Sequence, residues 1–260
     1  MAAAAPESLI FVGGAPRSGT TVGHALICTA DGVSRYNPEI SFFRGFLSAY
    51  RNGKAAWDGH TSSFFADRAA FRQLIVETTD LALGRIWEAL DRPLILALKD
   101  PHLTPFFPDL HELYPAARFV TLCRHPFDVV RSRQAVHEKT PDARAFGRDD
   151  VTAVAREYLA YYRTVLQTDF GGRHAILRYE DLNDETARRN LAGFLGLDGF
   201  HVERLWGQAS VHAEDDAWGS PKYNQPIDLE RRLEPLASEW AEITAAICGP
   251  VMQRLGYTAP

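Results

Sequence analysis

The chain of 260 residues has few cysteines and no long apolar run. Its three cysteines, Cys28, Cys123 and Cys248, lie far apart and show no paired spacing, which argues against a disulfide framework and against a zinc cluster. The apolar run near the N-terminus is too short, and too soon broken by glycine, for a signal peptide or a membrane span. We therefore expect reduced, buried thiols in a soluble, cytoplasmic protein.

The chain also has no excess of basic over acidic residues. The 28 lysines and arginines stand against 33 aspartates and glutamates, which gives a formal net charge of -5. A protein that binds nucleic acid regardless of sequence needs a basic face to neutralise phosphates, so nucleic acid is not an expected partner. Nothing in the sequence indicates an oligomeric state. With 46% apolar residues, the chain suffices for one α/β domain over residues 1–260.

The stretch LIFVGGAPRSGTTVGH, residues 9–24, runs from an apolar strand through a glycine-rich turn into a helix. Gly14 and Gly19 have the spacing G-x-x-x-x-G of a phosphate-binding loop, whose amides hold oxyanions at the positive end of the following helix. Thr20 stands where a nucleoside triphosphatase has its lysine, and the cation is Arg17, inside the loop. The missing lysine argues against transfer of a γ-phosphate with magnesium. A tight glycine turn without a ligand is the alternative interpretation.

Two more apolar runs end in candidate site residues. LILALKDPH ends in Lys99, Asp100 and His102, which combine a cation, a carboxylate and an imidazole as catalytic sites do. RFVTLC, residues 118–123, leads into Arg124, whose planar guanidinium suits phosphate, and then to Ser132. Apolar residues at helical spacing predict long helices over residues 67–90 and 149–169, both assigned to packing. Residues 51–63 have the composition of a loop.

These motifs resemble those of sulfotransferases that use 3′-phosphoadenosine 5′-phosphosulfate (PAPS). PRSGTT after an apolar strand is similar to their 5′-phosphosulfate loop, and CRHPFDVVRS, with Arg124 and Ser132, is similar to their 3′-phosphate site. A fourth apolar run, HAILR at residues 174–178, precedes Tyr-Glu-Asp-Leu; in the family that tyrosine, here Tyr179, lies by the adenine. The resemblance implies a P-loop-like three-layer α/β fold, with a central parallel sheet flanked by helices.

The motifs are most similar to those of tyrosylprotein sulfotransferases. Glu39 follows a proline and matches the glutamate that acts there as the general base, and Lys99 lies in a similar Lys-Asp-Pro element. A lysine at this place stabilises charge on the bridging oxygen that leaves. In cytosolic small-molecule sulfotransferases, a catalytic histidine follows the corresponding lysine. His102 is therefore a rival base, because an imidazole accepts a proton near neutral pH with little tuning.

A glycine- and proline-containing segment, WGSPKYNQP, is similar to the loop that closes the nucleotide site in the family. Ser220 matches a serine near the start of that loop. Gln225 stands before Pro226, where tyrosylprotein sulfotransferases have a lysine, and Lys222 is a candidate for its replacement. This departure leaves the acceptor open.

The sequence therefore predicts transfer of a sulfuryl group from PAPS to an acceptor hydroxyl, on a peptide tyrosine, a carbohydrate or a small molecule, without a metal. The catalytic candidates are Glu39, His102, Lys99 and Arg17. The residues expected to bind PAPS are Arg17, Ser18, Gly19, Thr20, Thr21, Arg124, Ser132, Tyr179, Ser220 and Lys222. Two alternatives remain: a nucleotide kinase-like phosphotransferase that needs ATP and magnesium, and a nucleotide-binding module without catalysis.

Overall fold

The computed structural model describes residues 6–140, 144–208 and 235–258. Within them, four parallel strands form one sheet in the order β2-β1-β3-β4. The strands are β1 (Ser8–Gly14), β2 (Ile95–Lys99), β3 (Arg118–Cys123) and β4 (His174–Arg178). The bounds of β3 and β4 are those expected from the sequence. β3 is buried along most of its length, whereas β4, at the edge of the sheet, leaves Ile176 37% exposed.

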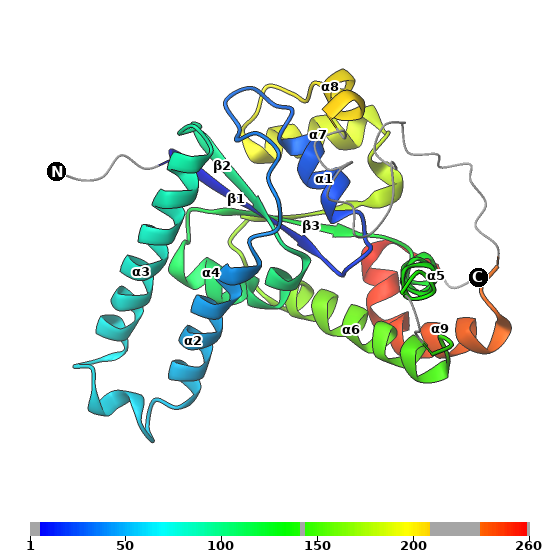
Figure 1. Cartoon of the computed structure of the whole chain (residues 1–260), viewed down its shortest axis with the longest axis horizontal. Coiled ribbons are helices and arrows are strands. Elements are labelled where there is room, and N and C mark those ends of the chain that lie inside the picture. Colours follow the sequence, from blue (N-terminus) through cyan, green and yellow to red (C-terminus); the bar gives the residue numbers. More distant parts are fainter. Residues whose placement is uncertain (1–5, 141–143, 209–234, 259–260) are drawn as a thin grey trace.

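Helices cover both faces of the sheet (Figure 1). In the described residues they are α1 (Thr20–Ile27), α2 (Arg44–Ala55), α3 (Arg68–Ala89), α4 (Phe107–Leu113), α5 (Pro126–His137), α6 (Arg148–Gln167), α7 (Glu185–Leu195), α8 (Val202–Gln208) and α9 (Ser238–Met252). Along β1, Ile10 and Val12 pack with α1, α7 and α8, whereas Phe11 packs on the face of α4 and α6. This alternation is the period of two expected of a strand. The predicted three-layer α/β fold is confirmed.

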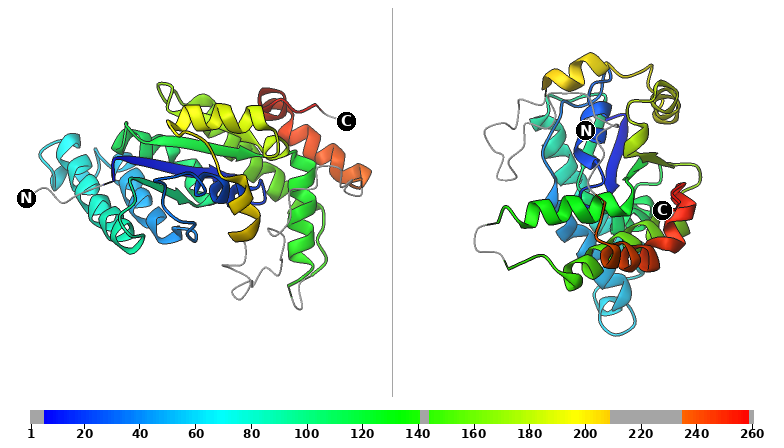
Figure 2. Two further views of the ribbon diagram at one scale, coloured as in Figure 1. Left: turned by 90° about the horizontal axis from the view of Figure 1, so that it is seen from above. Right: turned by 90° about the vertical axis from the view of Figure 1, so that its right-hand side faces the viewer.

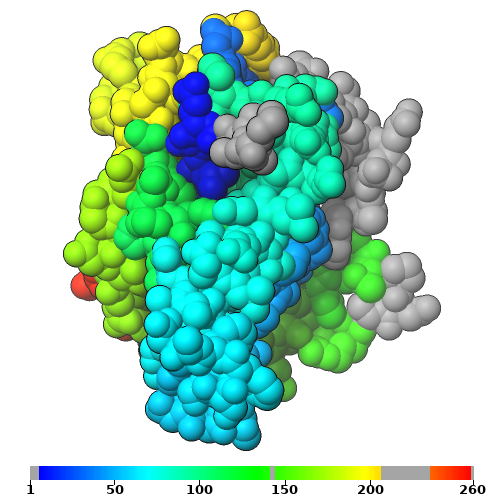
Figure 3. Space-filling model, turned by 90° about the vertical axis from the view of Figure 1, so that its left-hand side faces the viewer, coloured from blue at the N-terminus to red at the C-terminus, as the bar shows by residue number. Residues whose placement is uncertain are grey.

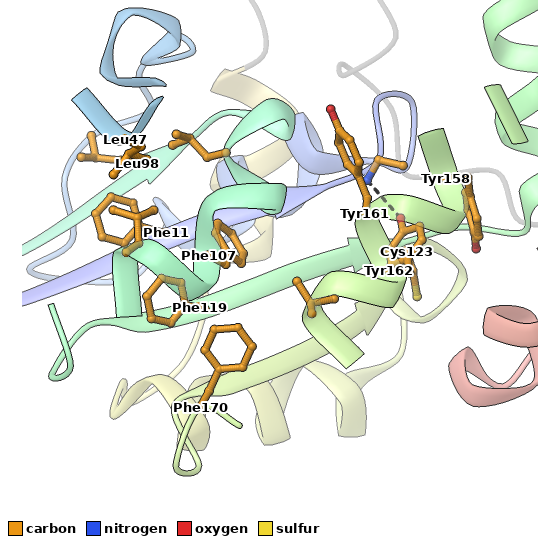
Figure 4. Close-up of a cluster of buried hydrophobic side chains, with 14 of the residues drawn as sticks. Phe11, Leu47, Leu98, Phe107, Phe119, Cys123, Tyr158, Tyr161, Tyr162 and Phe170 are labelled. Atoms are coloured by element: carbon orange, nitrogen blue, oxygen red, sulfur yellow. Dashed lines mark hydrogen bonds between the residues drawn. The ribbon is translucent and has the colours of Figure 1, made fainter. Parts of the chain in front are cut away.

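Stacked and tilted aromatic rings fill the core on the α4 and α6 face (Figure 4). The ring of Phe119 lies 5.8 Å from that of Phe11, 5.0 Å from Phe107 and 5.3 Å from Phe170, measured between centroids. Rings in tilted contact at these distances add to the stabilisation from burial alone. The middle of the sheet is therefore a rigid base for the loops at its carboxyl edge.

α2 and α3 form a long pair that extends from the body of the protein, and α3 makes up much of the surface in Figure 3. The expectation of a loop over residues 51–63 is wrong in part, because α2 continues to Ala55. Leu47 and Tyr50 bury one face of α2, and Gly53 lets it approach α3 so closely that a Cβ there would lie 2.2 Å from the ring of Phe71. Packing against α3 thus extends a helix that its own sequence does not favour.

The three cysteines are free and buried, as expected. Burial raises the pKa of Cys123 and of Cys248 to about 12 and raises that of Cys28 further, so all three are thiols rather than reactive thiolates. Among the described helices, none has the length and apolar character needed to cross a membrane.

Candidate active site

The glycine-rich loop lies between β1 and α1, at the carboxyl edge of the sheet. Gly14 and Gly19 have positive φ angles of 138° and 87°. A Cβ on Gly14 would lie 2.2 Å from the carbonyl oxygen of Leu122, and one on Gly19 would lie 2.4 Å from the ring of Tyr179. Both glycines of the motif are thus required by the backbone angle and by close neighbours. The first amides of α1 have no partner inside the helix, so this edge has donors for an anion.

The loop is held from beneath by two hydroxyl groups. Thr104 Oγ1 accepts a hydrogen bond from Gly14 N at 2.6 Å. Tyr162, fully buried on α6, accepts one from Ala15 N at 3.2 Å, and its oxygen lies 2.8 Å from Ser18 Oγ. Neither residue was singled out from the sequence. A tyrosine in the middle of a buried helical face could have pointed to such a role, because a buried phenolic hydroxyl needs a partner.

The hydroxyl groups of the loop differ in burial and in their partners. The hydroxyl oxygen of Ser18 is buried and lies 2.8 Å from that of Tyr162, and its amide donates to Ala15 O at 3.0 Å. The contact of Ser18 with a nucleotide stays a prediction. Thr20 is buried. Thr21 is partly exposed, and its Oγ1 lies 3.4 Å from Lys99 Nζ.

Lys99 and Glu39 form an ion pair beside this end of the loop. Lys99 Nζ lies 2.9 Å from Glu39 Oε1. The lysine side chain is only 3% exposed, whereas that of the glutamate is 45% exposed. Lysine carries three N–H donors, and Glu39 with Thr21 accept two of them. The pair therefore combines a buried positive charge with a carboxylate that solvent and a substrate can reach.

His102 is held by other neighbours. Asp100, fully buried at the end of β2, accepts a hydrogen bond from His102 N at 2.8 Å and lies 3.1 Å from Arg44 Nε. Burial raises the pKa of Asp100 in spite of these contacts. The ring nitrogen Nδ1 of His102 lies 2.7 Å from the hydroxyl of Tyr161, whose pKa burial raises well above its usual value. Tyr161 thus stays protonated at neutral pH.

Arg124 and Ser132 lie on the other side of the loop, at the end of β3 and on α5. The helix α5 lies beyond the carboxyl ends of the strands (Figure 2). Ser132 Oγ accepts a hydrogen bond from Arg17 Nε at 3.1 Å, so the loop and the second motif are in direct contact. The Arg124 guanidinium lies 4.4 Å from the ring centroid of Tyr179, the ring that also packs on Gly19.

The backbone of Arg124 is also held by α6. The hydroxyl of Tyr158 donates to Arg124 O at 3.0 Å, one helical turn before Tyr162. Arg124 Nε is buried and, within the described residues, has no hydrogen-bond acceptor, although Asp128 Oδ2 lies 3.6 Å away. A guanidinium whose side chain is 18% exposed and whose buried Nε–H is unused fits an anionic ligand. The helix predicted for packing alone therefore supports both anion motifs.

Of the residues predicted from the sequence, Ser220 and Lys222, like Gln225 and Pro226, lie outside the described residues. The others form two groups at the carboxyl edge: Glu39, Lys99 and Thr21 on one side, and Arg17, Gly19, Arg124, Ser132 and Tyr179 on the other. His102 follows β2, with Tyr161 as its ring partner. In the described part of the chain, no three His, Cys, Asp or Glu side chains are grouped so as to hold a metal.

Comparison with known proteins gives a consistent result. A sequence profile described as the sulfotransferase family matches residues 9–201. A Caenorhabditis briggsae protein named "Putative protein-tyrosine sulfotransferase" is 30% identical over 142 residues, which are 53% of this chain and 46% of that protein. The match thus spans about half the length of that curated relative.

Solved structures of low sequence identity share the fold. The sulfotransferase domain of the Synechococcus PCC 7002 olefin synthase superposes with a TM-score of 0.55 at 16% identity, over 98% of this chain and 97% of that one. The sulfotransferase domain from the curacin biosynthetic pathway gives 0.54 at 18% identity, over 99% and 100%. The sulfotransferase STF9 of Mycobacterium avium gives 0.52 at 14% identity, over 98% and 78%. Since the family profile covers most of the sequence, the chain belongs to the sulfotransferase family.

Proposed function

We propose that this protein transfers the sulfuryl group of PAPS to an acceptor hydroxyl, and that the acceptor is a tyrosine side chain. The observation that carries the proposal is the contact between Arg17 Nε and Ser132 Oγ at 3.1 Å. It brings the loop suited to a 5′-phosphosulfate next to the motif suited to a 3′-phosphate, as a single nucleotide with both groups requires. A protein that bound one phosphate would not need the two motifs in contact.

The residues present fit such a nucleotide. Arg124 has an unused buried N–H, and Tyr179 presents a ring beside it. The start of α1 offers amides to the sulfate end. Arg17 and Lys99 supply positive charge on either side of the loop, where charge develops on the departing oxygen.

In the proposed reaction the acceptor oxygen attacks sulfur, and the bond between sulfur and the 5′-phosphate oxygen breaks. The acceptor gives up its proton to a base. Lys99 and Arg17 stabilise negative charge on the leaving oxygen by electrostatic interaction, and the loop holds the group in line. We assign the base to Glu39, because its carboxylate is accessible and lies 2.9 Å from Lys99 Nζ.

His102 remains the rival candidate for the base. Its Nδ1 lies 2.7 Å from the hydroxyl oxygen of Tyr161. A phenolic hydroxyl both donates and accepts hydrogen bonds, so this contact fits a proton on either ring nitrogen. The comparison of Glu39→Gln with His102→Ala decides between the two candidates.

The first test is thermal unfolding with excess 3′-phosphoadenosine 5′-phosphate, beside the same protein with ATP and magnesium. A ligand at about a hundred times its dissociation constant adds roughly 2.7 kcal/mol of stability. In a chain of this length that is a rise of several degrees in the unfolding midpoint. A rise with the bisphosphate alone supports the proposal. A rise only with ATP and magnesium would favour the kinase-like alternative.

The second test is turnover with radiolabelled PAPS. A tyrosine peptide should accept label, and the same peptide with phenylalanine in place of tyrosine should not. The name of the C. briggsae relative and the motif likeness support this acceptor over a sugar or a small-molecule hydroxyl. Label on a sugar alone would refute the tyrosine assignment.

Variants then separate catalysis from binding. Arg17→Ala and Lys99→Ala should each lower turnover by about a hundredfold, the usual cost of removing a charge-stabilising donor. Glu39→Gln should be far more damaging than His102→Ala, and the opposite ranking would make His102 the base. If the wild type bound 3′-phosphoadenosine 5′-phosphate but showed no turnover, and these variants left that binding unchanged, the protein would be a nucleotide-binding module without catalysis.

A further inference from the structure

The segment that carries Glu39 runs along the outer edge of β2, the edge strand of the sheet. In Figure 1 it is the connection between α1 and α2. At its start, Ser34 N donates to Ile95 O at 2.8 Å, and Ile95 N donates to Gly32 O at 2.9 Å. At its end, Ile40 N donates to Lys99 O at 3.2 Å. The segment is therefore bonded to β2 at both ends, as a further parallel strand would be.

Between these ends, side chains of the segment, rather than its backbone, form hydrogen bonds with β2. The outward amide and carbonyl of Ala97 both meet Ser34 Oγ, which accepts from Ala97 N at 3.1 Å and lies 3.2 Å from Ala97 O. Asn37 Nδ2 donates to the same carbonyl at 3.0 Å and to Arg35 O at 3.1 Å. Ser34 and Asn37 are both buried. The two side chains thus make the middle bonds that a regular strand would have made with its own backbone.

A histidine of α1 lies at the same carbonyl, and its ring centroid is 5.3 Å from that of Tyr36 in the segment. Nε2 of His24, on α1, lies 3.1 Å from Ala97 O. Burial, with the nearby positive charge of Lys99, lowers the pKa of His24 to about 3, so the ring is neutral and donates through Nε2. The carbonyl oxygen of Ala97, in β2, therefore has hydrogen-bonding contacts with both α1 and the segment.

The position of Glu39 depends on the hydrogen bonds between the segment and β2. Its own side chain is 45% exposed, so few contacts hold it besides the ion pair with Lys99. Its backbone stands two residues after Asn37 and one before Ile40, both of which are bonded to β2. Pro38 between them fixes φ and keeps Asn37 extended. The distance from Glu39 to Lys99 is then set mainly by where the segment is attached.

We propose that Ser34 and Asn37 are positioning residues for Glu39, and that their side chains fix the backbone from which Glu39 reaches Lys99. This inference rests on the proposed role of Glu39 as the base. Neither residue is assigned a contact with a substrate. Both act through the segment, and the loss of either should misplace the carboxylate without changing the nucleotide site.

The test begins with hydrogen exchange, which needs no acceptor. In Asn37→Ala, the amides of residues 33–43 should exchange roughly tenfold faster than in the wild type, as expected from the loss of buried hydrogen bonds. Amides of β1 and β3 should stay protected. Ser34→Ala is the second variant and should act in the same way. Unchanged exchange in the segment in both variants would overturn the proposal.

Turnover with PAPS and a tyrosine peptide is the second readout. Asn37→Ala should lower kcat by about tenfold to a hundredfold, the effect of a misplaced catalytic group. The affinity for 3′-phosphoadenosine 5′-phosphate should stay within about twofold, because Arg124 and Ser132 lie on other elements. Asn190→Ala, at an exposed position of α7, is the matched control and should leave both quantities unchanged.

A double-mutant cycle tests the positioning role of Asn37 separately from the role of Glu39 as the base. If Asn37 acts only through Glu39, Asn37→Ala should have little further effect on kcat in a Glu39→Gln background. A loss of the same size in both backgrounds would refute the positioning role while leaving the base intact. A Glu39→Gln variant with wild-type turnover would refute the base itself, and the role assigned to Asn37 with it.

Discussion

Replacing Tyr162 with phenylalanine tests whether α6 holds the glycine-rich loop in place. The change removes one oxygen and keeps the ring, so the packing of the core is preserved. That oxygen accepts from Ala15 N at 3.2 Å and lies 2.8 Å from Ser18 Oγ and from Leu122 O, one of which takes its proton. Burial raises the pKa of Tyr162 far above its usual value, so the hydroxyl is a donor throughout the working range.

The expected loss of stability follows from the buried groups that lose their hydrogen bond to the Tyr162 hydroxyl. An unpaired buried donor or acceptor costs about 1 to 3 kcal/mol. At about 2 to 4 °C per kcal/mol for a chain of this size, the unfolding midpoint should fall by roughly 2 to 12 °C. Tyr158→Phe is the comparison, because it removes a single hydrogen bond, to Arg124 O. It should cost less than Tyr162→Phe.

The same variant should also weaken the nucleotide site. With Ala15 N and Ser18 Oγ released, the loop loses the bonds that fix it over α6, and the affinity for 3′-phosphoadenosine 5′-phosphate should fall. Calorimetric unfolding and a binding titration measure the two effects on one sample. An unfolding midpoint and an affinity equal to those of the wild type would show that the hydroxyl does not hold the loop.

Two further predictions concern the loop glycine and the effect of pH. In a binding titration, Gly19→Ala should lower nucleotide affinity more than Gly171→Ala. Both positions have positive φ, but only a Cβ on Gly19 would contact the ring of Tyr179. Equal losses of affinity in the two variants would contradict this prediction. Burial lowers the pKa of His24 to about 3 and that of His174 to about 4, so below pH 6.5 the unfolded chain binds more protons than the folded one. Stability should therefore fall as pH drops from 6.5 to 5, by about 1.4 kcal/mol per pH unit for each histidine, and urea unfolding of His174→Gln should show about half the slope. A flat profile in the wild type would refute this assignment.

Local patterns were enough to predict the fold class and to identify candidate site residues that the structure brings to one edge of the sheet. The mostly apolar stretches RFVTLC at residues 118–123 and HAILR at residues 174–178 predicted strands with the bounds that the structure has. Parallel strands bring their carboxyl ends to one edge, so Lys99 at the end of β2 and Arg124 after β3 lie at the same edge of the sheet. The spacing of Gly14 and Gly19 predicted the loop, and positive φ at both is a requirement that glycine meets without strain.

Contacts between distant parts of the chain decided the rest. Arg17 meets Ser132, 115 residues away, and Ala15 meets Tyr162, 147 residues away. No sequence period encodes such pairs, because they arise only when the strands are side by side and α6 packs beneath them. The same holds for the contact between Ser18 Oγ and the hydroxyl of Tyr162, 144 residues away.

The sequence by itself therefore determined which candidate groups are present: a glycine-rich loop suited to an oxyanion, an arginine and a serine suited to a second one, and a lysine with two candidate bases. Only the tertiary structure decided which partner each group has. Lys99 pairs with Glu39, and His102 with Tyr161. The physical reason is that burial and hydrogen bonding, which set the charge and direction of a side chain, depend on the elements that pack around it.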